Sequence, residues 1–331
     1  MKKICTILSL FILVSCANES SDELTIYTSR QPQLLEPIIE NFYKDTGIKV
    51  NLLSGNAQEL MERIDAEGTD SKADIFMTVD AGVLWQATDR NIFSETDSPI
   101  LENNIPSYLR DPNGQWFGLS KRARTIVYSS DQFSSDDFSS YEDLANPKWK
   151  GKLCLRTSKK VYNRSLMASM IDAYGFNKAK EIVSGWVANL ATEVFSNDTS
   201  ALKAVSSGQC GVTIVNTYYL ARLLDDPKYD NLQLVWANQS GRGVHVNISG
   251  AGIVKTSKNK ENAQKLLEYL SSDTAQDFYA SANKEYPVLK GADIDDSIKD
   301  WGSFVEDNIN VSKLGSLQKE AVFLAQEVGY K

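Results

Sequence analysis

Short apolar runs alternate with helix-periodic segments in the first part of the chain, and this alternation limits the fold more than any other feature. Leu24–Tyr27 is a β-branched and aromatic run, and apolar side chains then recur at helical spacing over 32–45. Gly47 stands where that helix would end. Strands alternating with helices favour a parallel sheet covered on both faces. The same order continues with predicted strands at 48–53 and 74–79 and predicted helices at 57–67 and 82–89.

The second half of the chain repeats this order. After removal of an N-terminal leader, about 315 residues remain. A chain of this length is longer than a single hydrophobic core usually organises, so two domains are predicted. Two β-rich segments, Arg124–Ser129 and Val244–Gly250, stand where the chain would pass between the two lobes. The predicted elements of the second lobe are strands at 152–155 and 211–215 and helices at 165–174 and 218–224.

The N-terminus predicts export and a lipid anchor. Lys2 and Lys3 precede an apolar run, Ile7–Val14, that is shorter than the roughly 20 residues a membrane-spanning helix needs. Ser15 then precedes Cys16, the pattern cut before a lipidated cysteine. We therefore predict a signal peptide at 1–15 and a lipidated tether at 16–23. The alternative is an ordinary cleaved signal in which Cys16 has no role.

The overall charge and the missing motifs exclude several classes of protein. Loss of Lys2 and Lys3 takes the formal charge from -8 to -10, and no basic block with interleaved aromatics offsets it, so nucleic acid is not an expected partner. Nucleotide-binding, hydrolase and zinc-protease motifs are missing from the sequence. His245, the one histidine, is interpreted as a hinge or cleft-wall residue. The chain is therefore not expected to be an enzyme.

Cys5 is lost with the signal peptide and Cys16 is predicted to be lipidated, which leaves Cys154 and Cys210 as the pair that can form a disulfide. In an oxidising compartment such a pair favours a disulfide. The alternative is two separate buried thiols, because spacing along the sequence does not fix geometry.

Tyrosines follow two predicted strands of the second lobe. Tyr162 follows strand 152–155, and the pair Tyr218 and Tyr219 follows strand 211–215. Ligand sites of open α/β sheets lie at the carboxyl ends of strands. Tyr162 and Tyr218 each lie eight residues after a cysteine, so a disulfide would hold the two loops side by side. Three phenols in one cleft suit Fe3+, a hard cation that prefers anionic oxygen; the alternative is that they cap helices and pack in interfaces.

Several segments resemble the ferric-ion-binding periplasmic proteins over nearly the whole mature chain. The resemblance implies a two-lobed type II periplasmic binding protein fold, related in architecture to transferrin lobes, and iron ligands at Tyr162, Tyr218 and Tyr219. Some relatives also use a His-Tyr dipeptide where this chain has Gln31 and Pro32, so the chain resembles the subgroup with three tyrosine ligands and no histidine. The segments are Tyr27–Pro32, Thr46–Asn51, Ala73–Asp80, Trp116–Tyr128, Val161–Leu166, Asn216–Leu220 and His245–Gly250.

Three phenolates leave Fe3+ with open coordination positions, which carbonate or another small synergistic anion would fill. Arg122 and Arg124 lie two residues apart on a predicted strand, hence on one face, and are predicted to hold the anion with forked hydrogen bonds. Arg30 is a third candidate. The alternative for each is a surface ion pair. Asn163, Asn197 and Gln31 are predicted to support the ligands from just outside them.

The sequence thus predicts an α/β protein of two lobes, each a mixed, mostly parallel sheet flanked by helices, with a ligand cleft between them. The expected function is extracytoplasmic Fe3+ binding, periplasmic or at the cell surface, by a lipid-anchored monomer that delivers iron to an ABC permease. Alternatives are a binder of an oxyanion or organic acid, a sensor with the same site, or an enzyme on this fold. The predicted lobes are 24–123 with about 250–288, and 124–249 with about 289–331.

Overall fold

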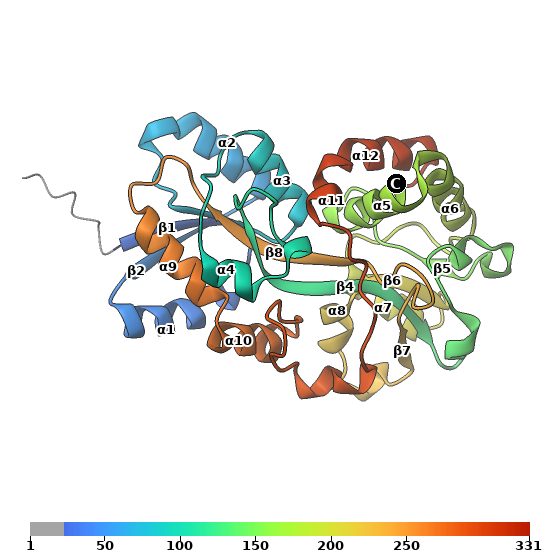
Figure 1. Ribbon diagram of the computed structural model, residues 1–331. Coiled ribbons are helices and arrows are strands. Elements are labelled where there is room, and N and C mark those ends of the chain that lie inside the picture. Colours follow the sequence, from blue (N-terminus) through green and yellow to red (C-terminus); the bar gives the residue numbers. More distant parts are fainter. Residues whose placement is uncertain (1–22) are drawn as a thin grey trace, which may run out of the picture.

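The structure is a computed structural model of the chain, and residues 23–331 are described (Figure 1). The predicted signal peptide, Cys16 and the tether up to residue 22 lie outside the described residues. The strands are β1 (Glu23–Thr28), β2 (Lys49–Ser54), β3 (Ile75–Thr78), β4 (Phe117–Ser129), β5 (Leu153–Cys154), β6 (Val212–Asn216), β7 (Leu232–Val235) and β8 (Val246–Ile253). The α-helices are α1 (Glu36–Thr46), α2 (Ala57–Glu67), α3 (Ala81–Asp89), α4 (Pro99–Asn104), α5 (Val161–Tyr174), α6 (Phe176–Ala188), α7 (Asp198–Ser206), α8 (Thr217–Ala221), α9 (Lys260–Leu270), α10 (Asp273–Asn283), α11 (Ser312–Ser316) and α12 (Gln318–Glu327).

The described strands form one mixed sheet in the order β2-β1-β3-β8-β4-β6-β5, with β7 paired to β4 beside this path. Pairs β1–β2, β1–β3 and β5–β6 are parallel, as the alternating pattern predicts. The four pairs that involve β4 or β8 are antiparallel, so the sheet is less parallel than predicted. Figure 1 shows two groups of helices around the two ends of this sheet, with β4 and β8 running between them.

Strand β4 belongs to both halves of the sheet. Its residues up to Ala123 pair with β8, and from Arg124 onward it pairs with β6 and β7. The predicted crossing at Arg124–Ser129 is therefore the second half of a longer strand that begins at Phe117. The residue boundaries of the two lobes stay a prediction.

Local sequence signals explain where several helices begin or end. Gly47 takes the left-handed conformation (φ 74°) that closes α1. The Asn56 side chain caps α2 by accepting from the amide of Gln58. Helix α5 departs from the prediction, because it begins at Val161 rather than at residue 165. Tyr162 therefore lies in a first helical turn, where the sequence predicts a loop.

Helix α11 connects the two groups of helices near the C-terminus. It packs against α3 on one side and α5 on the other, as Figure 1 shows at the top of the molecule. Gly315 permits this approach, because a Cβ there would lie 2.3 Å from the Cβ of Trp85 on α3. Helix α12 then packs on α5 and α6. The C-terminal segment thus lies across both halves.

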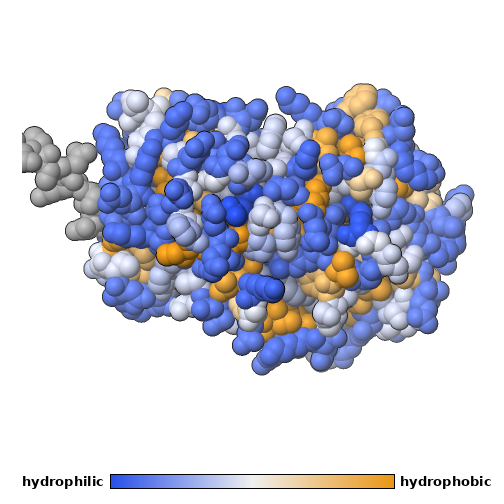
Figure 2. Space-filling model, viewed as in Figure 1, coloured by the Kyte–Doolittle hydropathy of each residue, from blue (hydrophilic) through white to orange (hydrophobic). Residues whose placement is uncertain are grey.

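Cys154 and Cys210 are joined by a disulfide, with their Cα atoms 5.9 Å apart. The bond ties β5 to the segment that leads into β6. Polar residues cover most of the face drawn in Figure 2, and hydrophobic atoms show in separate patches, one of them at the lower centre. Among residues 23–331, no helix has the length and apolar composition that a membrane crossing requires.

Candidate functional site

A pocket of about 260 Å³ opens where several strands end. Ser29–Gln31 follow β1, Val79 follows β3, Arg156 follows β5, and the two tyrosines of α8 follow β6. This is the edge at which open α/β sheets present ligand sites. The residues that line the pocket are Ser29, Arg30, Gln31, Leu34, Val79, Arg122, Arg156, Lys160, Tyr162, Tyr218, Tyr219, Arg222, Ser249 and Glu285.

The three tyrosines singled out in the sequence meet in this pocket. Tyr162 stands in the first turn of α5, and Tyr218 and Tyr219 stand in the first turn of α8. The hydroxyls of Tyr162 and Tyr218 lie close enough for each to shift the pKa of the other, and the rings of Tyr218 and Tyr219 have centroids 4.4 Å apart. The parallel pairing of β5 with β6, together with the disulfide, brings the two helix starts together.

The phenols of Tyr162 and Tyr218 are held in their neutral form. Their side chains are buried, and this burial raises the pKa of both, that of Tyr218 strongly. Mutual repulsion among the phenols raises the pKa further, while the positive charge of Arg122 lowers it. Deprotonation therefore needs a strong additional positive charge, such as a bound metal ion supplies.

Cations surround the aromatic rings. The guanidinium carbons of Arg122 and Arg156 lie 5.5 Å and 5.2 Å from the ring centroid of Tyr162. That of Arg222 lies 5.0 Å from the ring of Tyr218, one helical turn away. Such contacts are attractive, and they strengthen when a phenol becomes anionic.

Arg30 and Arg122 line the pocket, and their role in holding an anion stays a prediction. Arg30 donates to Glu285 at 2.6 Å and to the Ser249 hydroxyl at 2.8 Å. Arg122 donates to the carbonyl of Val79 and lies 4.0 Å from Asp80. Within the described part of the chain, Nε of Arg30 and Nη1 of Arg122 have no hydrogen-bond partner. These two atoms are donors that a bound anion can use.

Arg124 does not line the pocket, and its predicted pairing with Arg122 as an anion clamp is wrong. Its Nη1 and Nη2 each donate to Asp198 at 3.1 Å, and Nε donates to Asn163 at 3.0 Å. The remaining donors reach the side chain of Asn216 and a backbone carbonyl of β6. All five N–H groups are thereby used, and the side chain is almost fully buried. The carboxylate of Asp198, far along the chain, thus binds the Arg124 guanidinium at the point where β4 changes its partner strand.

The predicted supporting residues occupy different places. The amide of Asn163 donates to the carbonyl of Arg156 and to the Tyr330 hydroxyl, and its oxygen accepts from Arg124, so these hydrogen bonds do not reach the three pocket tyrosines. Asn197 caps α7 by accepting from the amide of Ser200, which contradicts a place beside the ligands. Gln31 is exposed and lines the pocket, and its predicted supporting role stays a prediction.

Four charged residues of the pocket were missed in the sequence. Arg156 lies two residues after the end of β5, which is a signal that strand-end reasoning could have used. Arg222 stands four residues after Tyr218, hence on the same face of its helix. Lys160 and Glu285 carry no signal of this kind. His245, interpreted as a hinge or cleft-wall residue, does not line the pocket; its carbonyl accepts from the amide of Arg124, and burial and the charge of Arg242 lower its pKa well below the usual value.

The donor set limits what the pocket can bind. Across residues 23–331, no group of three or more His, Cys, Asp or Glu side chains could hold a metal ion. The pocket instead offers three phenols, one carboxylate and five cations. A soft or borderline metal would find no suitable ligands here, whereas a hard cation that deprotonates the phenols, or an anion, would find them.

Comparisons with known proteins agree with this architecture. Residues 70–305 match the bacterial extracellular solute-binding protein family. Iron uptake protein A1 of Synechocystis is 44% identical over 315 residues, covering 93% of this chain and 88% of the relative. The major ferric iron-binding protein of Neisseria gonorrhoeae is 25% identical over 281 residues, covering 83% of each chain. A Trichodesmium FutA structure in complex with iron and citrate ligands superposes with a TM-score of 0.90 at 44% identity, covering 93% of this chain and all of that one. The chain therefore belongs to the bacterial extracellular solute-binding proteins.

Proposed function

We propose that this protein binds ferric iron outside the cytoplasm and delivers it to an importer in the membrane. The observation that carries the proposal is the meeting of Tyr162, Tyr218 and Tyr219 in one pocket that has no histidine or cysteine. Phenolate is the anionic oxygen donor that this site offers to a hard trivalent cation. Relatives named for iron uptake and ferric iron binding support the assignment.

A small anion completes the coordination of the iron. Three phenolates leave open positions on Fe3+. Arg30 and Arg122 line the same pocket, each keeps a donor atom without a partner among residues 23–331, and guanidinium groups suit carbonate or a carboxylate. Iron with citrate in the related Trichodesmium structure supports an anion partner of this kind.

Export and anchoring follow from the N-terminal signal. Cleavage before Cys16 and its lipidation would hold the protein at the membrane surface as a monomer near an ABC permease. Lobe closure around iron would present the loaded form to that permease. The closed form could instead signal to a receptor, and this sensor role uses the same residues.

The second candidate function is the binding of an oxyanion or organic acid without metal. The surplus of positive charge in the pocket favours it, because four arginines and one lysine face a single carboxylate among the lining residues. In that case the arginines would be the primary ligands and the tyrosines the walls. An enzymatic role lacks support, because the pocket holds no nucleophile paired with a base.

Titration of the mature protein with ferric citrate, with and without bicarbonate, separates the two candidates. Iron bound by tyrosinate gives a coloured charge-transfer band, whereas an anion binder gives none. Tyr162→Phe and Tyr218→Phe each remove one donor and should weaken iron binding at least tenfold while leaving the melting temperature nearly unchanged. Tyr43→Phe is the matched control, because Tyr43 is an exposed side chain on α1. Unchanged iron affinity in both pocket variants would contradict the proposed ligands.

A further inference from the structure

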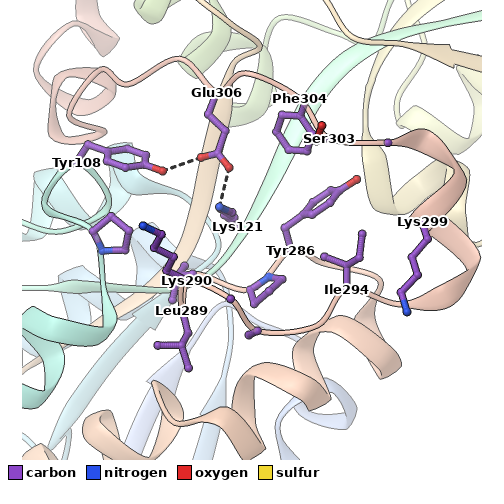
Figure 3. A pocket seen from close by; sticks show the side chains of 16 residues that line it. Tyr108, Lys121, Tyr286, Leu289, Lys290, Ile294, Lys299, Ser303, Phe304 and Glu306 are labelled. Carbon is purple, nitrogen blue, oxygen red and sulfur yellow. Dashed lines mark hydrogen bonds and ion pairs between the residues drawn. The ribbon is translucent and has the colours of Figure 1, made fainter.

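A second pocket, larger than the tyrosine pocket, lies between β4 and the chain segment that follows α10. Its volume is about 640 Å³, within the range of small-molecule sites. The walls come from residues 286–306, from β4 and from the turn at 106–108 (Figure 3). None of these residues lines the tyrosine pocket. The two cavities therefore have separate walls and can be tested separately.

The body of this pocket is aromatic and aliphatic. The ring of Tyr286 lies 5.2 Å from that of Phe304 in an edge contact, and Phe304 stacks on Trp236 at 4.0 Å. Ile294 and Leu289 face the same space (Figure 3). An apolar or aromatic body of a ligand would gain contact here with side chains that are already fixed by stacking.

One buried polar atom in the wall lacks a partner. Tyr286 is 5% exposed, and its hydroxyl makes no hydrogen bond to any of residues 23–331. Figure 3 shows this hydroxyl pointing to the side of the pocket where Ser303 and Lys299 lie. Burial raises the pKa of this phenol, so it remains a hydrogen-bond donor. A buried donor of this kind is normally satisfied in a folded protein, so a ligand atom that accepts here would complete the site.

The charges at the opposite side leave one cation free. Glu306 accepts from Lys121 at 2.6 Å and from the Tyr108 hydroxyl at 2.8 Å, so its charge is already matched. Lys290 lines the pocket near Tyr108 and has no ion pair with any acidic group in the described chain. Lys299 is paired with Asp296, so it contributes less positive charge to the pocket than Lys290 does. The uncompensated charge at this pocket is thus positive.

We propose that this pocket is a second ligand site, for an aromatic carboxylate whose acid group pairs with Lys290 and whose far end accepts a hydrogen bond from Tyr286. The apolar walls take the ring, and the two polar groups at opposite sides set its direction. This site is independent of the proposed iron site.

Isothermal titration with three matched compounds tests the proposal. Methoxyphenylbutyrate carries both a carboxylate and a far acceptor, phenylbutyrate lacks the acceptor, and methoxyphenylbutanamide lacks the charge. We expect one methoxyphenylbutyrate per protein with a Kd of about 1 mM or below. Tyr286→Phe should weaken binding of that compound by roughly 2- to 12-fold, the effect of one hydrogen bond, and leave phenylbutyrate unaffected. Lys290→Gln should weaken both acids about threefold and leave the amide unaffected.

Lys319→Gln, an exposed change on α12, is the matched control. Tyr286→Phe keeps the ring and removes a hydroxyl without a partner, so the variant should fold and bind iron like the parent. Binding that is lost in Arg122→Gln and kept in Tyr286→Phe and Lys290→Gln would place the acids in the tyrosine pocket and overturn the proposal. So would the absence of binding at ten times the expected Kd.

Discussion

Replacing Arg124 with glutamine tests whether two neighbouring arginines of β4 have different tasks. The Arg124 guanidinium is buried and uses all five donors, two of them on the carboxylate of Asp198, which is itself fully buried. Glutamine keeps some hydrogen bonding and removes the charge. Asp198 then retains one longer contact, with Nη1 of Arg156 at 3.4 Å.

The expected cost follows from the burial of this pair. Breaking a buried ion pair by removing one partner costs about 3–5 kcal/mol, because an uncompensated charge stays behind. For a chain of this size that corresponds to a loss of roughly 5–8 °C in Tm. Arg122→Gln should behave differently. Its ion pair with buried Asp80 is longer, at 4.0 Å, and Asp80 keeps hydrogen bonds from Ser165 and Asn247, so we expect weaker iron and bicarbonate binding with a smaller loss of stability than in Arg124→Gln.

Urea unfolding of both variants, with iron titration in the presence and absence of bicarbonate, measures the two effects. Arg122→Lys keeps the positive charge but loses the two parallel hydrogen bonds that a guanidinium can donate. We expect it to bind iron with an affinity between those of the parent and Arg122→Gln. The separation of tasks is refuted if Arg124→Gln is as stable as the parent, or if Arg122→Gln binds iron normally and shows no change in its bicarbonate dependence.

Three further predictions concern the disulfide and pH. Replacing Cys154 and Cys210 with serine opens a loop of sequence separation 56 and should lower the free energy of unfolding by about 4 kcal/mol in the chain-entropy estimate; two alkylatable thiols in unreduced exported protein would contradict the bond. Iron affinity should fall with falling pH, because burial raises the phenol pKa values and each ligating phenol must lose its proton; a pH-independent affinity measured by competition with citrate would contradict phenolate ligation. Burial lowers the pKa of His245 in the folded protein, so the unfolded chain binds a proton at this side chain more readily. The free energy of unfolding should therefore fall as the pH drops below about 6.5, by at most about 1.4 kcal/mol per pH unit. His245→Gln should reduce this slope in urea unfolding between about pH 5 and 7.

The order of strands and helices was predictable because it rests on local patterns. Apolar spacing, glycine helix ends and capping side chains act over a few residues, and the observed bounds of α1 and α2 follow from them. The antiparallel share of the sheet was not predictable in the same way. It arises because β4 and β8 pair with each other and with strands of both halves, and pairing between distant segments leaves no local signal.

The same distinction separates the predicted site residues that reach the pocket from those that do not. Tyr162 and Tyr218 follow strands that pair directly, so their meeting could be predicted from their positions along the chain. The place of Arg124 depends on Asp198, a residue 74 positions away. Two residues on one strand face look equivalent in sequence, and a buried carboxylate on α7 decides which of them is free to bind a ligand.

The charges of the pocket explain why the iron proposal needs an anion. Four arginines and one lysine face one carboxylate among the lining residues, and burial keeps the phenols of Tyr162 and Tyr218 neutral until a metal arrives. Three phenolates would offset most of this positive charge. The arginines therefore stabilise the deprotonated tyrosines that iron binding requires. Fe3+ then adds three positive charges in a half-buried space, where unmatched charge is costly. A carbonate or carboxylate held by Arg30 and Arg122 reduces that excess and fills the open coordination positions, so iron and anion should each bind more tightly when the other is present.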